Sequence, residues 1–215
     1  MAVGYGGSRP QAEEVAGELT ALGRRAIAVG GDLADPATPA RIFDEVEGAL
    51  GAVDVLIANA GVGGDPTGVL ELSLPEWQRT LAINLTAPFL LAQRAFGGML
   101  ERGFGRIVFV SSVAAYTGGL IGAHYAASKA GLHGLAHSLA RQGGGRGVTV
   151  NVVAPGLIET DMMPADPTVR ERLAATRAVG RLGTAEEVAE LVAAVVANAY
   201  VSNQSIVIDG GTLPT

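Results

Sequence analysis

The sequence predicts a doubly wound α/β fold, in which a parallel sheet lies between two helical layers in a three-layer αβα arrangement. Short runs rich in β-branched residues alternate with amphipathic segments along the whole chain. The runs are continuously apolar rather than alternating, which is typical of strands buried on both faces of a parallel sheet. Strand–helix–strand repetition then implies right-handed crossovers between parallel strands.

Length and composition bound the class of protein. With 215 residues the chain is long enough for one domain with a substantial core, and we expect a single domain over residues 1–215. The net charge of -6 argues against a nucleic-acid partner. The chain has no cysteine, which excludes disulfides and suits a reducing cytoplasm. No apolar run is long enough to span a bilayer and no signal-peptide pattern is present, so we expect a cytoplasmic protein without a membrane partner.

Six apolar runs are the predicted strands. They cover residues 1–4, 26–30, 53–58, 106–111, 148–153 and 205–209. The helices between them carry start signals. Ser8, Ser73 and Thr184 each precede a Glu or Gln by three positions, which predicts a capping box. Pro36 is predicted to lie in a first helical turn, where its missing N–H has no cost.

Polar or glycine-rich signals follow four of the predicted strands. Because ligands of such sheets bind at the carboxyl ends of the strands, these signals indicate a functional site. They are GGDLAD, ANAG, SS and APGLIET, in chain order.

The most specific motif pairs Tyr125 with Lys129, four positions apart and so on one face of a helix. A phenol has a pKa of about 10. A neighbouring ammonium lowers that pKa and brings proton exchange with a substrate oxygen within reach. Lys129 is the only lysine of the chain, which indicates a need for a compact ammonium. The alternative is an exposed tyrosine beside a snorkelling lysine.

The combination of ANAG, Asn84 in LAINL, Ser112, Tyr125-x-x-x-Lys129 and PGLIET resembles the short-chain dehydrogenase/reductase family. The resemblance runs over essentially the whole chain. Within the family, the sequence is most similar to the bacterial 3-oxoacyl-acyl-carrier-protein reductase group. A Rossmann-like sheet is the fold that this resemblance implies.

The resemblance implies four catalytic roles. Tyr125 is the general acid that gives a proton to the carbonyl oxygen as hydride arrives. Lys129 lowers the pKa of the tyrosine and holds the nicotinamide ribose. Ser112 orients the carbonyl, and Asn84 holds a water that links Lys129 to solvent. Capping or kinking of its helix is the alternative role of Asn84.

The resemblance also implies a set of cofactor-binding residues at the strand ends, besides Tyr125 and Lys129. The family's usual first Asn of the ANAG motif is Ala58 here. The residues expected to line the path of the cofactor, to meet its adenine, or to meet its carboxamide and diphosphate are Asn59, Ala60, Gly61, Asp32, Leu33, Pro155, Gly156, Ile158 and Thr160.

One family feature is missing. Family members begin with a strand that ends in TGxxxGxG, the diphosphate loop, and nothing like it precedes ANAG. In register with the family, MAVGYG matches the second strand, so the usual first β–α unit, about 30 residues, is lacking. A fragment or misassigned start is the explanation we favour. The others are a strand supplied by another segment or chain, or MAVGYG in the first-strand position with GYGGS as a phosphate loop.

The turn after MAVGYG bears on the choice of cofactor. It offers no acid for the ribose hydroxyls of NAD, whereas Ser8 and Arg9 suit the extra phosphate of NADP. We therefore expect NADP rather than NAD. Ser8 has a second interpretation as a plain helix cap.

The expected function is NADPH-dependent reduction of a small ketone, such as a 3-oxoacyl thioester, to the alcohol. The alternatives are a dehydrogenase of alcohols or sugars, and a non-catalytic subunit of a hetero-oligomer. No metal is expected, because His133 and His137 have helical spacing but no third ligand. By resemblance, residues 162–177 form a lid over the substrate, and the chain forms a homotetramer or dimer.

Overall fold

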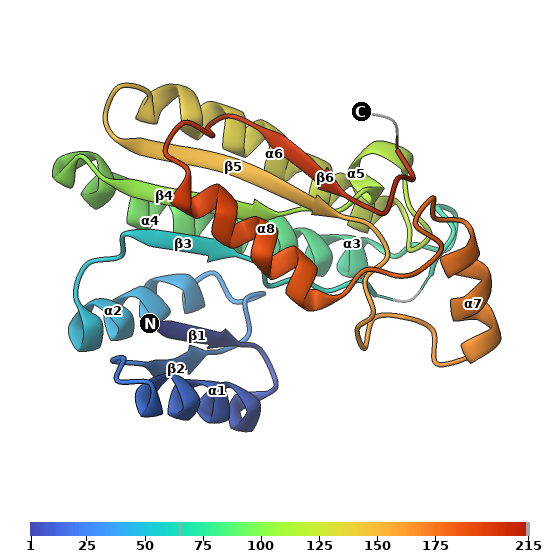
Figure 1. The fold of residues 1–215 in the computed structure, drawn as a ribbon, viewed down its shortest axis with the longest axis horizontal. Helices are drawn as coiled ribbons and strands as arrows, with labels where there is room; N and C mark the ends of the chain where they lie inside the picture. Colours follow the sequence, from blue (N-terminus) through green and yellow to red (C-terminus); the bar gives the residue numbers. More distant parts are fainter. Residues whose placement is uncertain (65, 214–215) are drawn as a thin grey trace.

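The computed structural model describes residues 1–64 and 66–213, and within them parallel strands are flanked by helices (Figure 1). All six predicted strands are confirmed, with ends that move by a few residues. They are β1 (Ala2–Tyr5), β2 (Ile27–Gly30), β3 (Val55–Ala58), β4 (Gly105–Val110), β5 (Val148–Pro155) and β6 (Ser205–Ile208). Every pairing between them is parallel, as predicted.

Helices cover the strands in two layers, which completes the predicted αβα arrangement (Figure 1). They are α1 (Arg9–Ala21), α2 (Thr38–Leu50), α3 (Leu74–Leu81), α4 (Ala87–Arg102), α5 (Ala114–Thr117), α6 (Ala123–Gly143), α7 (Pro167–Ala175) and α8 (Ala185–Ala197). The main core joins α2, α4 and α6 to one face of β3, β4 and β5. A smaller core joins α8 to the other face. No helix in the described part of the chain could cross a membrane.

The sheet is split in two. β1 pairs with β2, while β3, β4, β5 and β6 form a separate sheet in that order. Among the described residues β1 has no pairing with β3. MAVGYG therefore lies beside β2, as the family's second strand does, and the idea that it occupies the first-strand position is wrong. That no strand of residues 1–64 and 66–213 lies between β1 and β3 agrees with the missing β–α unit.

Both strands that border the split carry unpaired edges. Asp54 O accepts from Arg106 N at 3.0 Å, so by the alternation of a parallel ladder the N–H and C=O groups of Val55 and Ile57 point away from β4. Both residues are also exposed, by 43% and 38%. On β1, Met1 O accepts from Ile27 N at 3.0 Å, which turns the backbone of Ala2 and Gly4 outward in the same way.

Helical contacts hold the two sheets together. α2 packs on β2 and on α4, and α4 packs in turn on β3 and β4. Arg94 on α4 binds Asp44 at 3.1 Å and Glu47 at 2.8 Å, both on α2. These ion pairs are exposed, so packing rather than charge supplies most of the stabilisation.

The helix starts follow the predictions in part. Thr184 forms the full capping box with Glu187, and Ser73 Oγ accepts from Glu76 N at 3.3 Å. Ser8 precedes α1 as predicted but makes no capping bond with its side chain, so its predicted capping box is wrong. Its φ of -103° and ψ of 55° lie outside the extended region from which a serine reaches the helical N–H groups.

The start of α2 also differs from the prediction. Pro36 lies in a turn before the helix, and Pro39 occupies the first turn instead. Asp35 closes the earlier turn, because its Oδ1 accepts from Ala37 N at 2.9 Å and its carbonyl from Thr38 N at 3.0 Å. An aspartate that binds its own backbone two residues on competes with the helix at that point.

Candidate active site

The four predicted catalytic residues meet at the carboxyl ends of β3 and β4. Tyr125 and Lys129 lie one turn apart on α6, Ser112 follows β4, and Asn84 lies in a short π-helical segment, η1 (Ala82–Thr86). Lys129 Nζ is 5.8 Å from the centre of the Tyr125 ring. A Cβ placed on Gly61 would lie 3.1 Å from Lys129 Nζ and 3.3 Å from Asn84 Oδ1. Both distances are tighter than ordinary van der Waals contact, so the backbone of ANAG and the candidate catalytic side chains border one space.

Lys129 is held inside the protein. It is 4% exposed, and its Nζ donates to the carbonyl of Val110 at 2.9 Å. The alternative of a snorkelling surface lysine is therefore wrong. Burial lowers the pKa of Lys129 to about 8, because desolvation disfavours the charged form. Its ammonium can thus lose or regain a proton near neutral pH.

Tyr125 differs from the expectation in the direction of its pKa shift. Burial raises the pKa of Tyr125, and a hydrogen bond with Ser112 opposes this only in part. Lys129, whose Nζ binds the Val110 carbonyl, is not among the groups that lower the pKa of Tyr125. The phenol is consequently protonated at neutral pH, which suits a group that gives a proton to a carbonyl oxygen.

Asn84 is fully buried, and its side chain is committed to other protein groups. Oδ1 accepts from Val62 N at 2.8 Å, while Nδ2 donates to Val62 O at 2.9 Å and to Ser128 Oγ at 3.1 Å. The surrounding π-helical turn has a local cause. Pro88 lacks the N–H that would bind the Asn84 carbonyl in an α-helix, and Ala87 N bonds to Ala82 O instead. A water held by Asn84 would therefore bind at its backbone carbonyl.

Two serines that sequence reasoning did not select support this site. Ser128 accepts from Asn84 and donates to Tyr125 O at 2.7 Å. Ser111 donates to Lys129 O at 2.9 Å. The only sequence signals were the serine inside YAASK and the first serine of the SS pair. Neither signal indicates which group the hydroxyl binds.

Several predicted cofactor residues lie near the four. Asn59, Ala60 and Gly61 directly follow β3, and Pro155 ends β5. Gly156 N donates to Ile208 O at 2.8 Å, and a Cβ on Gly156 would collide with Asp209. Ile158 forms an isolated parallel bridge with Gly183, and Thr160 is exposed beyond it.

The predicted adenine and phosphate residues lie on the other side of the split, at the ends of β1 and β2. Arg9 is exposed and its Nε binds Glu13 Oε1 at 2.7 Å. Asp32 accepts from Ala34 N at 3.0 Å and pairs with Arg79 at 3.3 Å. Leu33 is half-buried beside it, and Ser8 stands just before α1.

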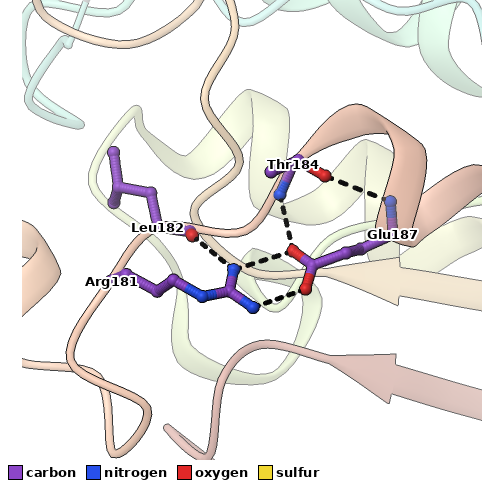
Figure 2. Close-up of polar contacts among 4 residues, drawn as sticks. All are labelled: Arg181, Leu182, Thr184 and Glu187. Atoms are coloured by element: carbon purple, nitrogen blue, oxygen red, sulfur yellow. Dashed lines mark hydrogen bonds and ion pairs between the residues drawn. The ribbon is translucent and has the colours of Figure 1, made fainter.

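A hollow of about 520 Å³ lies beside α7 and α8, with Glu159, Arg181 and Thr184 among its lining residues. Arg181 binds Glu187 through two nitrogens, at 2.6 and 2.9 Å, and Glu187 Oε2 also accepts from Thr184 N at 2.9 Å (Figure 2). These bonds lower the pKa of Glu187 to about 2. The hollow is lined by neither Tyr125 nor Lys129, so it borders the predicted lid rather than the catalytic pair.

The described residues fit one end of an NAD(P) molecule. A phenol, an ammonium and a hydroxyl beside the open backbone of Gly61 match the donors that a nicotinamide riboside needs. A diphosphate needs a glycine-rich loop that enters a helix at the switch point of the sheet. Between β1 and β3, the described residues supply no such loop.

The fold and the Asn–Ser–Tyr–Lys cluster define a dinucleotide-dependent oxidoreductase of the α/β class. The family model described as short chain dehydrogenase matches residues 1–170. The chain belongs to the short-chain dehydrogenase/reductase family, whose members are NAD(P)-dependent oxidoreductases.

Curated relatives include two reductases of 3-oxoacyl thioesters. The acetoacetyl-CoA reductase of Cupriavidus necator is 39% identical over 194 residues, which cover 90% of this chain and 78% of that protein. The 3-oxoacyl-[acyl-carrier-protein] reductase of Escherichia coli is 37% identical over 183 residues, 84% of this chain and 75% of that one. Among solved structures, a blue fluorescent protein from a metagenomic library, in complex with NADPH, superposes with a TM-score of 0.91 at 38% identity. The superposition covers 99% of this chain and 87% of that chain.

Proposed function

We propose that this protein reduces the ketone of a 3-oxoacyl thioester, or of a similar small carbonyl compound, to the alcohol with NADPH. The observation that carries the proposal is the clustering of a protonated, half-buried Tyr125 with Ser112 and Lys129 beside Gly61. The two curated reductases support the choice of substrate. NADP rather than NAD is proposed because Arg9 and Ser8 follow β1 without an acid.

Each residue has a separate task in this reaction. Ser112 donates a hydrogen bond to the substrate carbonyl and so places its oxygen next to the Tyr125 hydroxyl. Tyr125 then gives its proton to that oxygen, which becomes the alcohol. The cofactor, when bound, supplies the hydride. Lys129 lies close enough to stabilise the phenolate left behind and, with a pKa of about 8, can pass a proton toward it.

The proton that Tyr125 loses must come back from solvent. The Asn84 carbonyl, which Pro88 deprives of its helical donor, is the group we propose to hold a water beside Lys129. Gly61 keeps the backbone close to both Lys129 Nζ and Asn84 Oδ1. We also propose that the chain works as a homo-oligomer, with α4 and α6 at the interface, and that residues 162–177 cover the substrate.

The test is NADPH oxidation with acetoacetyl-CoA, followed by absorbance. We expect turnover by the wild-type protein, and a fall in kcat of about 100-fold or more for Tyr125→Phe, because the general acid is lost. Tyr200→Phe is the matched control, since Tyr200 is 99% exposed and far along the chain from the site.

Two results would contradict the proposal. A folded Tyr125→Phe protein that keeps wild-type turnover would remove the tyrosine from the mechanism. A folded wild-type protein that oxidises sugars or alcohols with NADP⁺ but does not reduce acetoacetyl-CoA would replace the proposed substrate with the dehydrogenase alternative.

A further inference from the structure

The end of β4 holds Lys129 at two points. Val110 is the last residue of β4, and its carbonyl accepts from Lys129 Nζ. The next residue, Ser111, donates from Oγ to the Lys129 carbonyl at 2.9 Å. Ser111 is 4% exposed, so both contacts are shielded from water. The same Ser111 Oγ lies 2.9 Å from His133 Nε2, one turn further along α6.

The hydrogens of this cluster can be assigned from its partners. A carbonyl only accepts, so the single hydrogen of the Ser111 hydroxyl is committed to Lys129 O. Ser111 must then accept from His133, which places the imidazole hydrogen on Nε2. The other nitrogen, Nδ1, is left as an acceptor, and Ser205 Oγ donates to it at 2.9 Å. The bonds therefore run in one direction, from Ser205 through His133 and Ser111 to Lys129.

The chain of bonds ties together three elements of the fold. Ser205 begins β6, His133 lies on α6 and Ser111 follows β4. The ring of Tyr116 packs edge-on against His133 with its centre 5.2 Å away, which fixes the plane of the imidazole. Burial and the nearby His137 lower the pKa of His133, so the ring is neutral at pH 7, as the assignment requires.

We propose that His133 is a positioning residue, which through Ser111 clamps the turn of α6 that carries Lys129 onto the end of β4. The description of that turn as catalytic rests on the proposed function, whereas the clamp itself rests on the contacts above. Without the Nε2 hydrogen, Ser111 is free to rotate away from the Lys129 carbonyl. Lys129 then leaves its position beside Val110 and Gly61 and becomes more hydrated.

Two substitutions separate the nitrogen atoms of His133. The amide of a glutamine reaches the position of Nε2, so His133→Gln keeps the donor to Ser111. The amide of an asparagine reaches the position of Nδ1, so His133→Asn keeps the contacts of that atom, with Ser205 Oγ and at 3.5 Å with the Tyr116 hydroxyl, and loses the donor to Ser111. His137→Asn is the outside control, because His137 is exposed on the next turn and binds Asn203 Oδ1 at 2.6 Å.

The readout uses the single lysine of the chain. In protein grown with ¹³C,¹⁵N-lysine, all lysine side-chain signals in the NMR spectrum come from Lys129. Their change with pH measures the pKa of Lys129 directly. We expect about 8 for the wild type, His133→Gln and His137→Asn, and a rise toward 10.5 for His133→Asn. In the reductase assay we expect His133→Asn to lower kcat roughly tenfold, with little change of KM, because a small displacement of a catalytic group is costly.

The outcomes are distinguishable from a failure of the proposed function, because the lysine signal needs no turnover. A raised pKa in His133→Asn alone supports the clamp even in a protein that reduces no ketone. An unchanged pKa in His133→Asn, or equal shifts in the asparagine and glutamine variants, would overturn it. The ¹⁵N shifts of the imidazole provide a second check, since a hydrogen on Nδ1 instead of Nε2 contradicts the assignment.

Discussion

At the scale of a single residue, the burial of the Lys129 ammonium has a cost that depends on pH. The pKa of Lys129 is about 8 in the folded protein, whereas the ordinary value of 10.5 applies in the unfolded chain. Below pH 8 both states are protonated, and the folded state bears the full cost, about 3 kcal/mol. Between pH 8 and 10.5 the unfolded state binds more protons, so this cost fades as the pH rises.

The comparison that isolates this effect is Lys129→Met, which keeps an unbranched side chain and removes the charge. We expect Lys129→Met to unfold at higher urea concentration than the wild type at pH 7. The difference in free energy of unfolding between the variant and the wild type should shrink by about 3 kcal/mol between pH 8 and 10.5. A difference that stays constant over this range would show that the ammonium is hydrated in the folded protein.

That the four candidate catalytic residues lie close together was predictable because their signals are local. Tyr125 and Lys129 share a helix face by spacing alone, and Ser112 follows a strand that composition indicates. The direction of the Tyr125 pKa shift was not predictable, since it depends on how deeply the fold buries the phenol. The partners of Ser111 and Ser128 were equally hidden, because both serines bind groups that tertiary packing brings to them.

At the scale of an element, the start of α8 shows what a capping box contributes. Thr184 Oγ1 accepts from Glu187 N at 3.2 Å, and Glu187 Oε2 in turn accepts from Thr184 N at 2.9 Å. We expect Thr184→Ala to lower the free energy of unfolding by about 1 kcal/mol, because a helical N–H loses its partner. Thr184→Ser, which keeps the hydroxyl, should stay close to the wild type. Urea unfolding of the three proteins is the measurement, and equal loss in both variants would assign the effect to the methyl group.

The elements differ in how well their pattern determined them. Strands β4 and β5 were visible as apolar runs because they are buried on both faces, and their residues are almost all buried here. The capping bond at Ser8 and the helix start at Pro36 were predicted wrongly, because they depend on the backbone angles at one residue and on competing bonds such as those of Asp35. Patterns of several residues thus predicted the elements better than single capping residues predicted their ends.

At the scale of the whole molecule, the missing first β–α unit was expected from the absent glycine motif, but the division of the strands into two sheets was not. The sequence left open whether β1 would close against β3, since both orders satisfy the same apolar pattern. The structure decides this through pairings far apart along the chain, β1 with β2 and β3 with β4. The consequence is that the sheet with the candidate catalytic residues and the sheet with the predicted adenine residues meet mainly through α2 and α4.

The split predicts an alternating pattern of amide hydrogen exchange along β3. Leu56 and Ala58 direct their N–H groups to β4, whereas those of Val55 and Ile57 point toward the split, where no described strand accepts them. We expect Val55 and Ile57 to exchange at least 100-fold faster than Leu56 and Ala58, because a free amide needs no opening of the sheet. NMR after transfer to D₂O measures the exchange of all four amides, and Ile107 in the middle of β4 provides the reference for full protection.

If Val55 and Ile57 are protected as strongly as Ile107, then another strand pairs with this edge in solution. In that case the two halves of the sheet are joined, and the diphosphate end of a cofactor gains a place to bind between them.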